Sequence, residues 1–367
     1  MNPLKLAFDA KRLFHNREGL GTYARTLVAD LQTLYPQHEY YLLTPSISTH
    51  SYCAYFLDET KFKIVTAQGK NAWYWRSRGM VKNLKANEID IYWGLSNELP
   101  FGIAKSAIKS VVTIHDMIYR TFPQQFSQID RWIYHRKFSN AIQSADLIMA
   151  TSENTRRDIT EYFPTSQSKI KTVYQSVSPS YRNVPASRQK GQHFLVVGTI
   201  NERKNLDLVV EAYHILESKD RRPVIVVGSG KAYLEKMKSK IARYALEDWF
   251  QFVGQVSTEK LIELYQGALG LLFPSLYEGF GIPILEAMMI GIPVIGNNVS
   301  SIPEVMGKYG IIIEYDSIES LKAAILKLSQ SDSVQDGKSD KEHLNRFKHD
   351  TIGQAIMQNL ELVKQLS

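Results

Sequence analysis

Short apolar runs alternate with helix-like stretches along nearly the whole chain, and this alternation constrains the fold more than any other feature. Runs rich in β-branched residues occupy residues 4–10, 40–44, 89–94, 110–116 and 146–152, and they resume at 193–199, 223–229, 250–255, 269–275, 292–297 and 310–315. This pattern is typical of βαβ units around parallel sheets. Several runs are continuously apolar, as expected for strands that helices cover on both faces. We therefore predict an α/β fold built from doubly wound parallel sheets.

The chain is predicted to form two domains. Its 367 residues exceed what one hydrophobic core usually organises. A polar stretch without apolar periodicity, residues 181–192, separates the two sets of runs. We predict a first Rossmann-like domain over residues 1–185 and a second over residues 186–345. A helical pattern covers residues 342–366, and residues 346–367 are predicted to pack as a terminal helix on the first domain.

The composition indicates a folded chain, with 44% hydrophobic and 22% charged residues. Cys53 is the single cysteine, which excludes an intrachain disulfide framework and a cysteine-based zinc cluster. No segment reaches the roughly 20 continuous apolar residues that span a bilayer. The apolar run at the N-terminus is also too short for a signal peptide core. We therefore expect a cytoplasmic protein.

Positive charge is concentrated in the first half of the chain. Residues 1–185 hold 23 Lys and Arg against 15 Asp and Glu, a net +8, whereas residues 186–367 hold 21 against 22, a net −1. The segment 73–78 adds three aromatic residues to Arg76 and Arg78, a composition suited to a membrane interface. We expect peripheral contact with an anionic membrane and no nucleic acid, since no nucleic-acid motif is present. A basic surface that only contacts solvent, or a phosphorylated acceptor, is the alternative.

Ligands of doubly wound sheets bind beyond the carboxyl ends of the strands, so the residues after each run are candidates. Gly19 and Gly21 precede a helix whose N-terminus can offer N–H groups to a phosphate, although a plain turn has the same pattern. His115 ends a strand-like run and can bond a ligand hydroxyl, or it is structural. Arg203 and Lys204 precede a helix, where cations are unfavourable. An anionic ligand explains this pair better than a solvated loop does.

The strongest signal lies in residues 274–305. Glu278 is followed by Gly279 and Gly281, and then by a predicted helix that contains Glu286. These groups can contact three parts of one ligand. The carboxylate of Glu278 can meet one part, the helix N-terminus can bind a diphosphate, and Glu286 can bind the vicinal hydroxyls of a ribose. Two solvated glutamates do not account for the dense glycines and the apolar sequence around them.

These residues resemble the signature of glycosyltransferase family 4, and the resemblance covers nearly the whole chain. Glu278, seven residues and Glu286, followed by Gly-x-Pro-Val-Ile and Ser-Ser-x-Pro-Glu-Val, is similar to the family's nucleotide-sugar motif. The resemblance implies a GT-B fold, in which two Rossmann-like domains face a cleft and the C-terminal helix crosses back to the first domain.

The resemblance also assigns roles to matching positions. Arg203 and Lys204 match the basic pair that neutralises the donor diphosphate. Glu278 and His115 match residues at the donor sugar, and Glu286 matches the residue that binds ribose. The remaining positions matched to the donor site are Gly19, Gly21, Thr199, Val253, Gly254, Gly279, Phe280, Gly281 and Ile282.

Thr199 departs from the family pattern, because many relatives place an arginine directly after the glycine of the first strand in the second domain. Arg203 is expected to supply that charge. Val253 and Gly254 lie where relatives line the nucleobase, and Gly281 and Ile282 match the family's turn whose following N–H groups reach the phosphates.

Transfer of a sugar requires the diphosphate to leave while positive charge develops at the anomeric carbon. Arg203, Lys204 and a helix N-terminus can stabilise the leaving group electrostatically. The sequence has no Asp-x-Asp to hold a divalent ion, so we expect no metal and no cofactor. The resemblance implies retention of configuration, with the acceptor attacking the face from which the leaving group departs.

The segments GLGTY, TIHD, GTINERKN and SLYEGFGIP look most like bacterial mannosyltransferases that build surface polysaccharides from GDP-mannose. The expected partners are thus a nucleotide sugar donor and a glycan or lipid-linked acceptor. A UDP-sugar-dependent glycosyltransferase, or a nucleotide-sugar epimerase or phosphorylase of similar fold, stays open.

Overall fold

A computed structural model describes residues 3–67, 71–185, 191–330 and 341–365. The chain divides into two compact units. Unit 1 comprises Met1–Ser178 with Arg346–Ser367, and unit 2 comprises Pro179–Asn345. Residues 179–185, which the sequence analysis placed in the first domain, therefore belong to unit 2, and the predicted linker falls partly outside the described residues.

Unit 1 contains a seven-stranded parallel sheet. Its strands are β1 (Lys5–Asp9), β2 (Glu39–Thr44), β3 (Phe62–Thr66), β4 (Ile91–Gly94), β5 (Lys109–Ile114), β6 (Leu147–Ala150) and β7 (Ile170–Thr172). They pair in the order β3-β2-β1-β4-β5-β6-β7, and every neighbouring pair is parallel. The direction of winding reverses between β1 and β4, which makes the sheet doubly wound.

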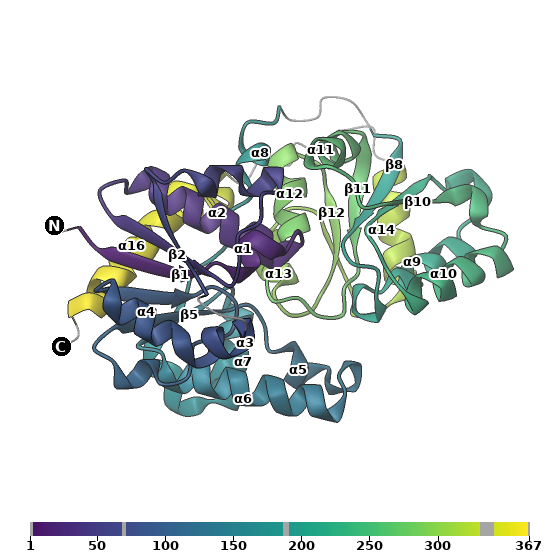
Figure 1. The fold of residues 1–367 in the computed structure, drawn as a ribbon. Coiled ribbons are helices and arrows are strands. Elements are labelled where there is room, and N and C mark those ends of the chain that lie inside the picture. The colour runs from purple at the N-terminus through teal and green to yellow at the C-terminus, as the bar shows by residue number, and fades with distance from the viewer. Residues whose placement is uncertain (1–2, 68–70, 186–190, 331–340, 366–367) are drawn as a thin grey trace. The chain divides into compact units, whose positions relative to one another are not determined.

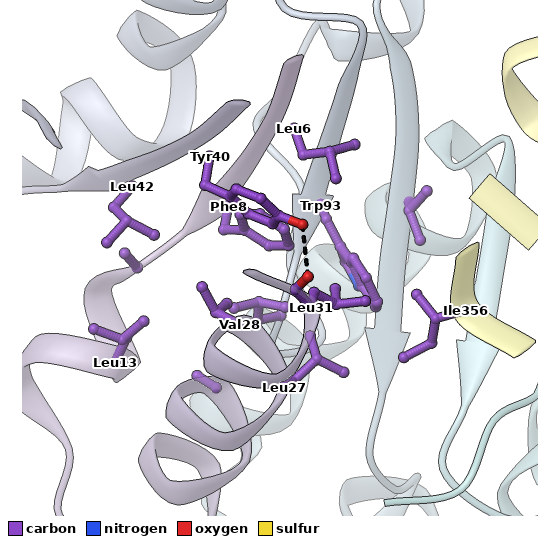
Figure 2. Packing of buried hydrophobic residues seen from close by; sticks show 14 of the residues in the cluster. Leu6, Phe8, Leu13, Leu27, Val28, Leu31, Tyr40, Leu42, Trp93 and Ile356 are labelled. Carbon is purple, nitrogen blue, oxygen red and sulfur yellow. Dashed lines mark hydrogen bonds between the residues drawn. The ribbon is translucent and has the colours of Figure 1, made fainter. Parts of the chain in front are cut away.

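Helices cover both faces of this sheet. They are α1 (Lys11–His15), α2 (Gly19–Leu34), α3 (Ala72–Tyr74), α4 (Met80–Ala86), α5 (Ile118–Thr121), α6 (Gln128–Ser144), α7 (Glu153–Tyr162) and α16 (His349–Gln365). Successive residues of β1 point to opposite faces. Leu6 and Phe8 enter one core with α2 and α16, and Ala7 enters the other with α4 and α6. Figure 2 shows the first core, where the hydroxyl of Tyr40 donates to the carbonyl of Leu31 at 2.8 Å.

The C-terminal segment returns to unit 1, which confirms the prediction that the terminal helix packs on the first domain. The predicted helix over residues 342–366 is two helices, α15 (Lys341–Asn345) and α16, with residues 346–348 between them. Helix α16 lies beside α2 (Figure 1) and buries Ile356 and Leu360 in the first core. The C-terminal helix is thus part of the core of unit 1.

Unit 2 repeats the architecture with a six-stranded sheet. Its strands are β8 (His193–Val197), β9 (Val224–Val227), β10 (Phe250–Gly254), β11 (Ala268–Phe273), β12 (Val294–Asn297) and β13 (Ile311–Ile313). They pair in parallel in the order β10-β9-β8-β11-β12-β13. Its helices are α8 (Pro179–Arg182), α9 (Leu206–Ile215), α10 (Ala232–Arg243), α11 (Thr258–Gln266), α12 (Ile282–Ile290), α13 (Ile302–Met306), α14 (Ile318–Gln330) and α15. The winding of this sheet reverses between β8 and β11.

The packing of α16 generates a prediction for stability. Leu360 is fully buried, whereas Leu362 on the same helix is 59% exposed. Leu360→Ala should lower the free energy of unfolding by about 2 to 5 kcal/mol, because it leaves a cavity in the core. Leu362→Ala should change it by no more than about 0.5 kcal/mol. Urea denaturation of both variants measures the contrast, and equal losses would show that α16 does not contribute to the core of unit 1.

Candidate active site

The switch point of the sheet in unit 2 brings together residues that are far apart in the sequence. Strands β8 and β11 are neighbours there, and both run toward the same edge. After β8 the chain forms a short 3-10 turn, Glu202–Lys204, before α9. After β11 it forms the loop that carries Glu278. Doubly wound folds bind ligands at such a point.

Arg203, Lys204 and Glu278 form a compact ion cluster at this edge. Nη1 of Arg203 and Nζ of Lys204 each lie 2.7 Å from the same oxygen, Oε1 of Glu278. Arg203 also donates to the carbonyl of Tyr277 at 2.6 Å, and the ammonium of Lys204 lies 4.8 Å from the centre of the Phe273 ring. The three charged side chains are 11% to 18% exposed. Two cations and one carboxylate leave a net charge of +1.

The cluster perturbs the protonation equilibria of its members. Burial alone would raise the pKa of Glu278, but the charges of Arg203 and Lys204, with hydrogen bonds from Lys204 and Ser275, lower it to about 2. Burial lowers the pKa of Lys204, and the carboxylate of Glu278 opposes that effect. Glu278 is therefore ionised at neutral pH.

Hydrogen bonds to backbone groups hold the Glu278 loop in place. The N–H of Glu278 donates to Oγ of Ser300 at 2.9 Å, and Oγ of Ser301 donates to the carbonyls of Glu278 and Phe280 at 2.9 and 2.8 Å. The N–H of Leu276 donates to the carbonyl of Arg203 at 2.8 Å, which joins the two loops. In the sequence the two serines stand only as part of the Ser-Ser-x-Pro-Glu-Val motif, which does not indicate this role.

Helix α12 begins directly after the glycines of this loop. Gly281 has a φ of 112°, a conformation that favours glycine, and a Cβ there would lie 3.0 Å from the side chain of Ile284. The N–H groups of Ile284 and Leu285 bond to the carbonyl of Gly281, and Pro283 has no N–H. In the first turn, the N–H of Ile282 is thus the group that α12 can offer to an anion.

Glu286 lies on α12 and is buried between two tyrosines. The hydroxyl of Tyr265, at the end of α11, donates to Oε2 of Glu286 at 3.0 Å. Burial raises the pKa of Glu286 to about 7, and hydrogen bonds from Tyr265 and Tyr181 partly oppose this. Tyr181 and Tyr265 also contact each other, with ring centres 6.2 Å apart. Tyr181 begins the polar stretch that was predicted to be a linker, but its side chain is buried because it packs on this cluster.

The other predicted donor-site residues of unit 2 lie at the same sheet edge or in the Glu278 loop. Thr199 follows β8 and is exposed. Val253 and Gly254 end β10, and the carbonyl of Gly254 accepts from the N–H of Gly228 at 2.8 Å. Gly279 is half-buried beside the buried Phe280.

His115 lies in unit 1, directly after β5. Its Nε2 is 2.9 Å from the carbonyl of Leu95, so Nε2 carries the proton and Nδ1 keeps the lone pair. Burial lowers the pKa of His115 to about 4; the bond to Leu95 opposes this and the charge of Arg12 adds to it. The ring also meets the ring of Tyr23 edge-on at 4.6 Å. A neutral His115 can accept a hydrogen bond at Nδ1.

Gly19 and Gly21 form the first turn of α2 in unit 1. A Cβ on Gly21 would lie 1.8 Å from the carbonyl oxygen of Asn16, so only glycine fits there. The N–H of Gly21 donates to Oδ1 of Asn16 at 3.1 Å and to the carbonyl of Glu18 at 2.9 Å. Gly19 is exposed, and a Cβ there would meet nothing within 4 Å.

The basic and aromatic segment 73–78, a predicted membrane contact, is exposed only in part, at Tyr74 and Arg78. Trp75 is buried, and its indole N–H donates to Asn83 at 2.8 Å. Arg76 forms ion pairs with Asp9 at 2.6 Å and with Glu98 at 2.8 Å, and its side chain is 15% exposed. The carboxyl ends of β1 and β4 bring these two carboxylates together, and Arg76 is drawn in to balance their charge.

The described residues contain no cluster of three His, Cys, Asp or Glu side chains arranged to hold a metal ion. Across the same residues, no helix is both long and apolar enough to cross a membrane.

The chain matches two family models that follow one another. Residues 17–181 match Glycosyltransferase Family 4, and residues 177–348 match glycosyl transferases group 1. The chain belongs to glycosyltransferase family 4. The resemblance inferred from the Glu278 and Glu286 segment is therefore confirmed.

The family 4 chain is similar to several curated mannosyltransferases. O-antigen chain mannosyltransferase B of Escherichia coli is 33% identical over 258 residues, which cover 66% of each chain. O-antigen chain mannosyltransferase RfbU of Salmonella typhimurium is 26% identical over 60% of each chain. The serotype-specific mannosyltransferase WbdA of Escherichia coli is 26% identical over 60% of this chain and 29% of its own. The matches thus span less than two thirds of these relatives.

Solved structures confirm the GT-B fold. Sucrose-phosphate synthase from Thermosynechococcus elongatus superposes with a TM-score of 0.77 at 18% identity, covering 99% of this chain and 100% of that one. The Anabaena protein HepE, solved with UDP and glucose, gives a TM-score of 0.72 at 17% identity, covering 98% and 99%. At such identities the likeness concerns the fold alone.

The low pKa of Glu278 generates a stability prediction. A pKa lowered from about 4.5 to about 2 corresponds to roughly 3 kcal/mol. Glu278→Gln should therefore destabilise unit 2 by about that amount at pH 7. Because the folded-state pKa lies below the unfolded one, this stabilisation is present above about pH 5 and is lost as the pH falls toward 2.

Urea denaturation of the wild type and Glu278→Gln at pH 7 and pH 3.5 measures this effect. Glu263→Gln is the matched control, since the pair of Glu263 with Lys260 is 63% and 56% exposed. A Glu278→Gln loss that is the same at both pH values would contradict the ion cluster as described.

Proposed function

We propose that this protein is a retaining, metal-independent mannosyltransferase that uses GDP-mannose. The acceptor is a glycan or a lipid-linked glycan in surface polysaccharide biosynthesis. The observation that carries the proposal is the cluster of Arg203, Lys204 and Glu278 at the switch point of a family 4 chain. The names of the similar mannosyltransferases support the choice of sugar.

The ion cluster is suited to a diphosphate leaving group. Its net charge of +1, held at low exposure, favours an anion more strongly than solvated cations would. The N–H of Ile282 at the start of α12 adds a donor at the positive end of the helix dipole. These groups can stabilise the diphosphate without a metal ion.

The state of Glu278 supports attack from the face of the departing group. A carboxylate whose pKa is about 2, with two cations on one oxygen, is a weak nucleophile and a weak base. A covalent intermediate on Glu278 is therefore disfavoured. In the proposed reaction the acceptor hydroxyl attacks the anomeric carbon, the bond to the diphosphate breaks, and the leaving phosphate oxygen takes the acceptor proton.

Glu286 is assigned to the ribose of the donor. Hydroxyl groups that donate to a carboxylate stabilise its ionised form, so ribose binding compensates for the burial that raises the pKa of Glu286 to about 7. His115, neutral and with Nδ1 as acceptor, is assigned to a donor-sugar hydroxyl rather than to proton abstraction.

A UDP-sugar donor is the second candidate. HepE, which shares the fold, was solved in complex with UDP and glucose. The two candidates differ in the nucleobase, for which Val253 and Gly254 are the proposed contacts.

Thermal unfolding with a panel of nucleotides distinguishes the donors, because a ligand that binds only the folded state stabilises it by mass action. GDP and GDP-mannose should raise the melting temperature more than UDP or NAD at the same concentration. At a hundredfold excess over the dissociation constant the gain is about 2.7 kcal/mol. A larger shift with UDP would remove the mannose assignment and leave the family and fold intact.

Two variants serve as internal controls for the panel, each compared with its own ligand-free form. Glu286→Ala should lose most of the GDP shift, since it removes the acceptor for the ribose hydroxyls. Glu278→Ala should keep most of it but lose turnover. Equal losses of the GDP shift would show that the roles of the two glutamates are divided wrongly.

A further inference from the structure

The first half of α6 exposes large apolar side chains. Ile129 is 72% exposed and Trp132 is 62% exposed, and the neighbouring Ile133 is 38% exposed. Spacings of three and four residues place these three on one side of the helix. The second half of α6 is different, because Phe138 packs into the core of unit 1. The exposed ridge is therefore not needed to build that core.

A pocket of about 470 Å³ lies beside this ridge. The residues that matter in its lining are Tyr119, Arg120, Arg131, Trp132, His135 and Tyr162. Arg120 donates to Nδ1 of His135 at 2.9 Å, and its guanidinium lies 5.7 and 5.6 Å from the ring centres of Tyr119 and Tyr162. Figure 1 shows α5, which carries Tyr119 and Arg120, beside α6. Two arginines and several aromatic residues thus line the pocket.

The charge around the ridge is strongly positive. Residues 118–144 contain four basic residues and one acidic residue. Lys137 pairs with Glu98, and Asp130 accepts from the hydroxyl of Ser127. The other three basic residues are Arg120, Arg131 and Arg136, and none of them takes part in an ion pair within the described residues.

We propose that the first half of α6 and the adjacent pocket dock unit 1 on an anionic bilayer. Ile129, Trp132 and Ile133 enter the boundary between headgroups and acyl chains, as amphipathic surface helices do. Arg120 and Arg131 hold a lipid phosphate in the pocket, since guanidinium groups bind phosphate oxygens in pairs. This surface replaces the segment 73–78 as the membrane contact.

The apolar ridge and the positive charge around it together favour an anionic bilayer over other partners. Nucleic acid would satisfy the arginines but would leave Ile129 and Ile133 in a polar environment. A second copy of the chain, paired by a two-fold axis, would bring two copies of this positively charged surface into one interface. An anionic bilayer supplies both an apolar layer and negative phosphates.

The role of this docking rests on the proposed function, because a lipid-linked acceptor lies at a membrane surface. Vesicle binding is measured without donor or acceptor. Failure of the docking therefore leaves the transfer assay unaffected, and failure of transfer leaves the docking intact.

Co-sedimentation of the full chain with vesicles tests the proposal. The protein should bind vesicles of phosphatidylcholine and phosphatidylglycerol in equal parts, and bind phosphatidylcholine alone much less. Binding should weaken as salt is raised, because screening removes the attraction. Bromine-labelled acyl chains should quench the fluorescence of the wild type. Trp132→Phe should still bind but lose most of that quenching.

Variants on the surface are compared with matched changes elsewhere in unit 1. Trp132→Ser should reduce binding to the level seen with phosphatidylcholine alone. Arg120→Gln and Arg131→Gln should each weaken binding about fivefold, the effect of one cation near an anionic surface. Leu362→Ser changes an equally exposed residue on α16, and Lys61→Gln removes a charge beside β3, the sheet edge opposite β7. Both controls, and Arg78→Ser, should bind as the wild type does.

Equal binding to both kinds of vesicle at low salt would overturn the proposal. Wild-type binding by Trp132→Ser, with its melting temperature unchanged, would also overturn it. A concentration-dependent dimer in sedimentation velocity that Trp132→Ser abolishes, with no vesicle binding, would assign the ridge to a second copy of the chain instead.

Discussion

Both sheets of this protein are parallel and covered by helices on both faces, and this constraint decides where polar chemistry can lie. The buried strands are mostly apolar, so the charged groups of the two ion clusters lie at or beyond the strand ends. In unit 2 the neighbouring strands β8 and β11 therefore deliver Arg203, Lys204 and Glu278 to one edge. The same constraint in unit 1 places Asp9 at the end of β1 and Glu98 after β4, where Arg76 balances their charges.

In the cluster around Glu278, the cost of burying charges opposes the attraction between them, and the resulting site suits the proposed reaction. Removing three charges from water costs energy, and the attraction between them compensates for that cost only because their geometry is close. The charges of Arg203, Lys204 and Glu278 sum to +1, which favours the binding of an anion. Hydrogen bonds from Ser300 and Ser301 hold the loop in the arrangement that the cluster needs.

Much of the fold follows from the sequence, and the exceptions have physical reasons. The eleven strands marked by apolar runs all form, but β3 and β7 were missed because they are sheet edges, half exposed and interrupted by Lys63 and Lys171. Spacing identified Arg203 and Glu278 separately as candidates. It could not show that they bind each other, because that contact depends on which strands are neighbours. The burial of Tyr181 and Arg76 likewise depends on tertiary partners that no local pattern encodes.

The central claim is that the protein's own cations, rather than a metal, support a transfer that retains configuration. The most direct test is the one-bond carbon–hydrogen coupling at the anomeric carbon of the transferred sugar, measured by NMR after reaction with GDP-mannose in the presence of EDTA. The account predicts an α-linked mannose, matching the α linkage of the donor, formed at the same rate with and without the chelator. A β-linked product, or no transfer until a divalent ion is restored, would contradict it.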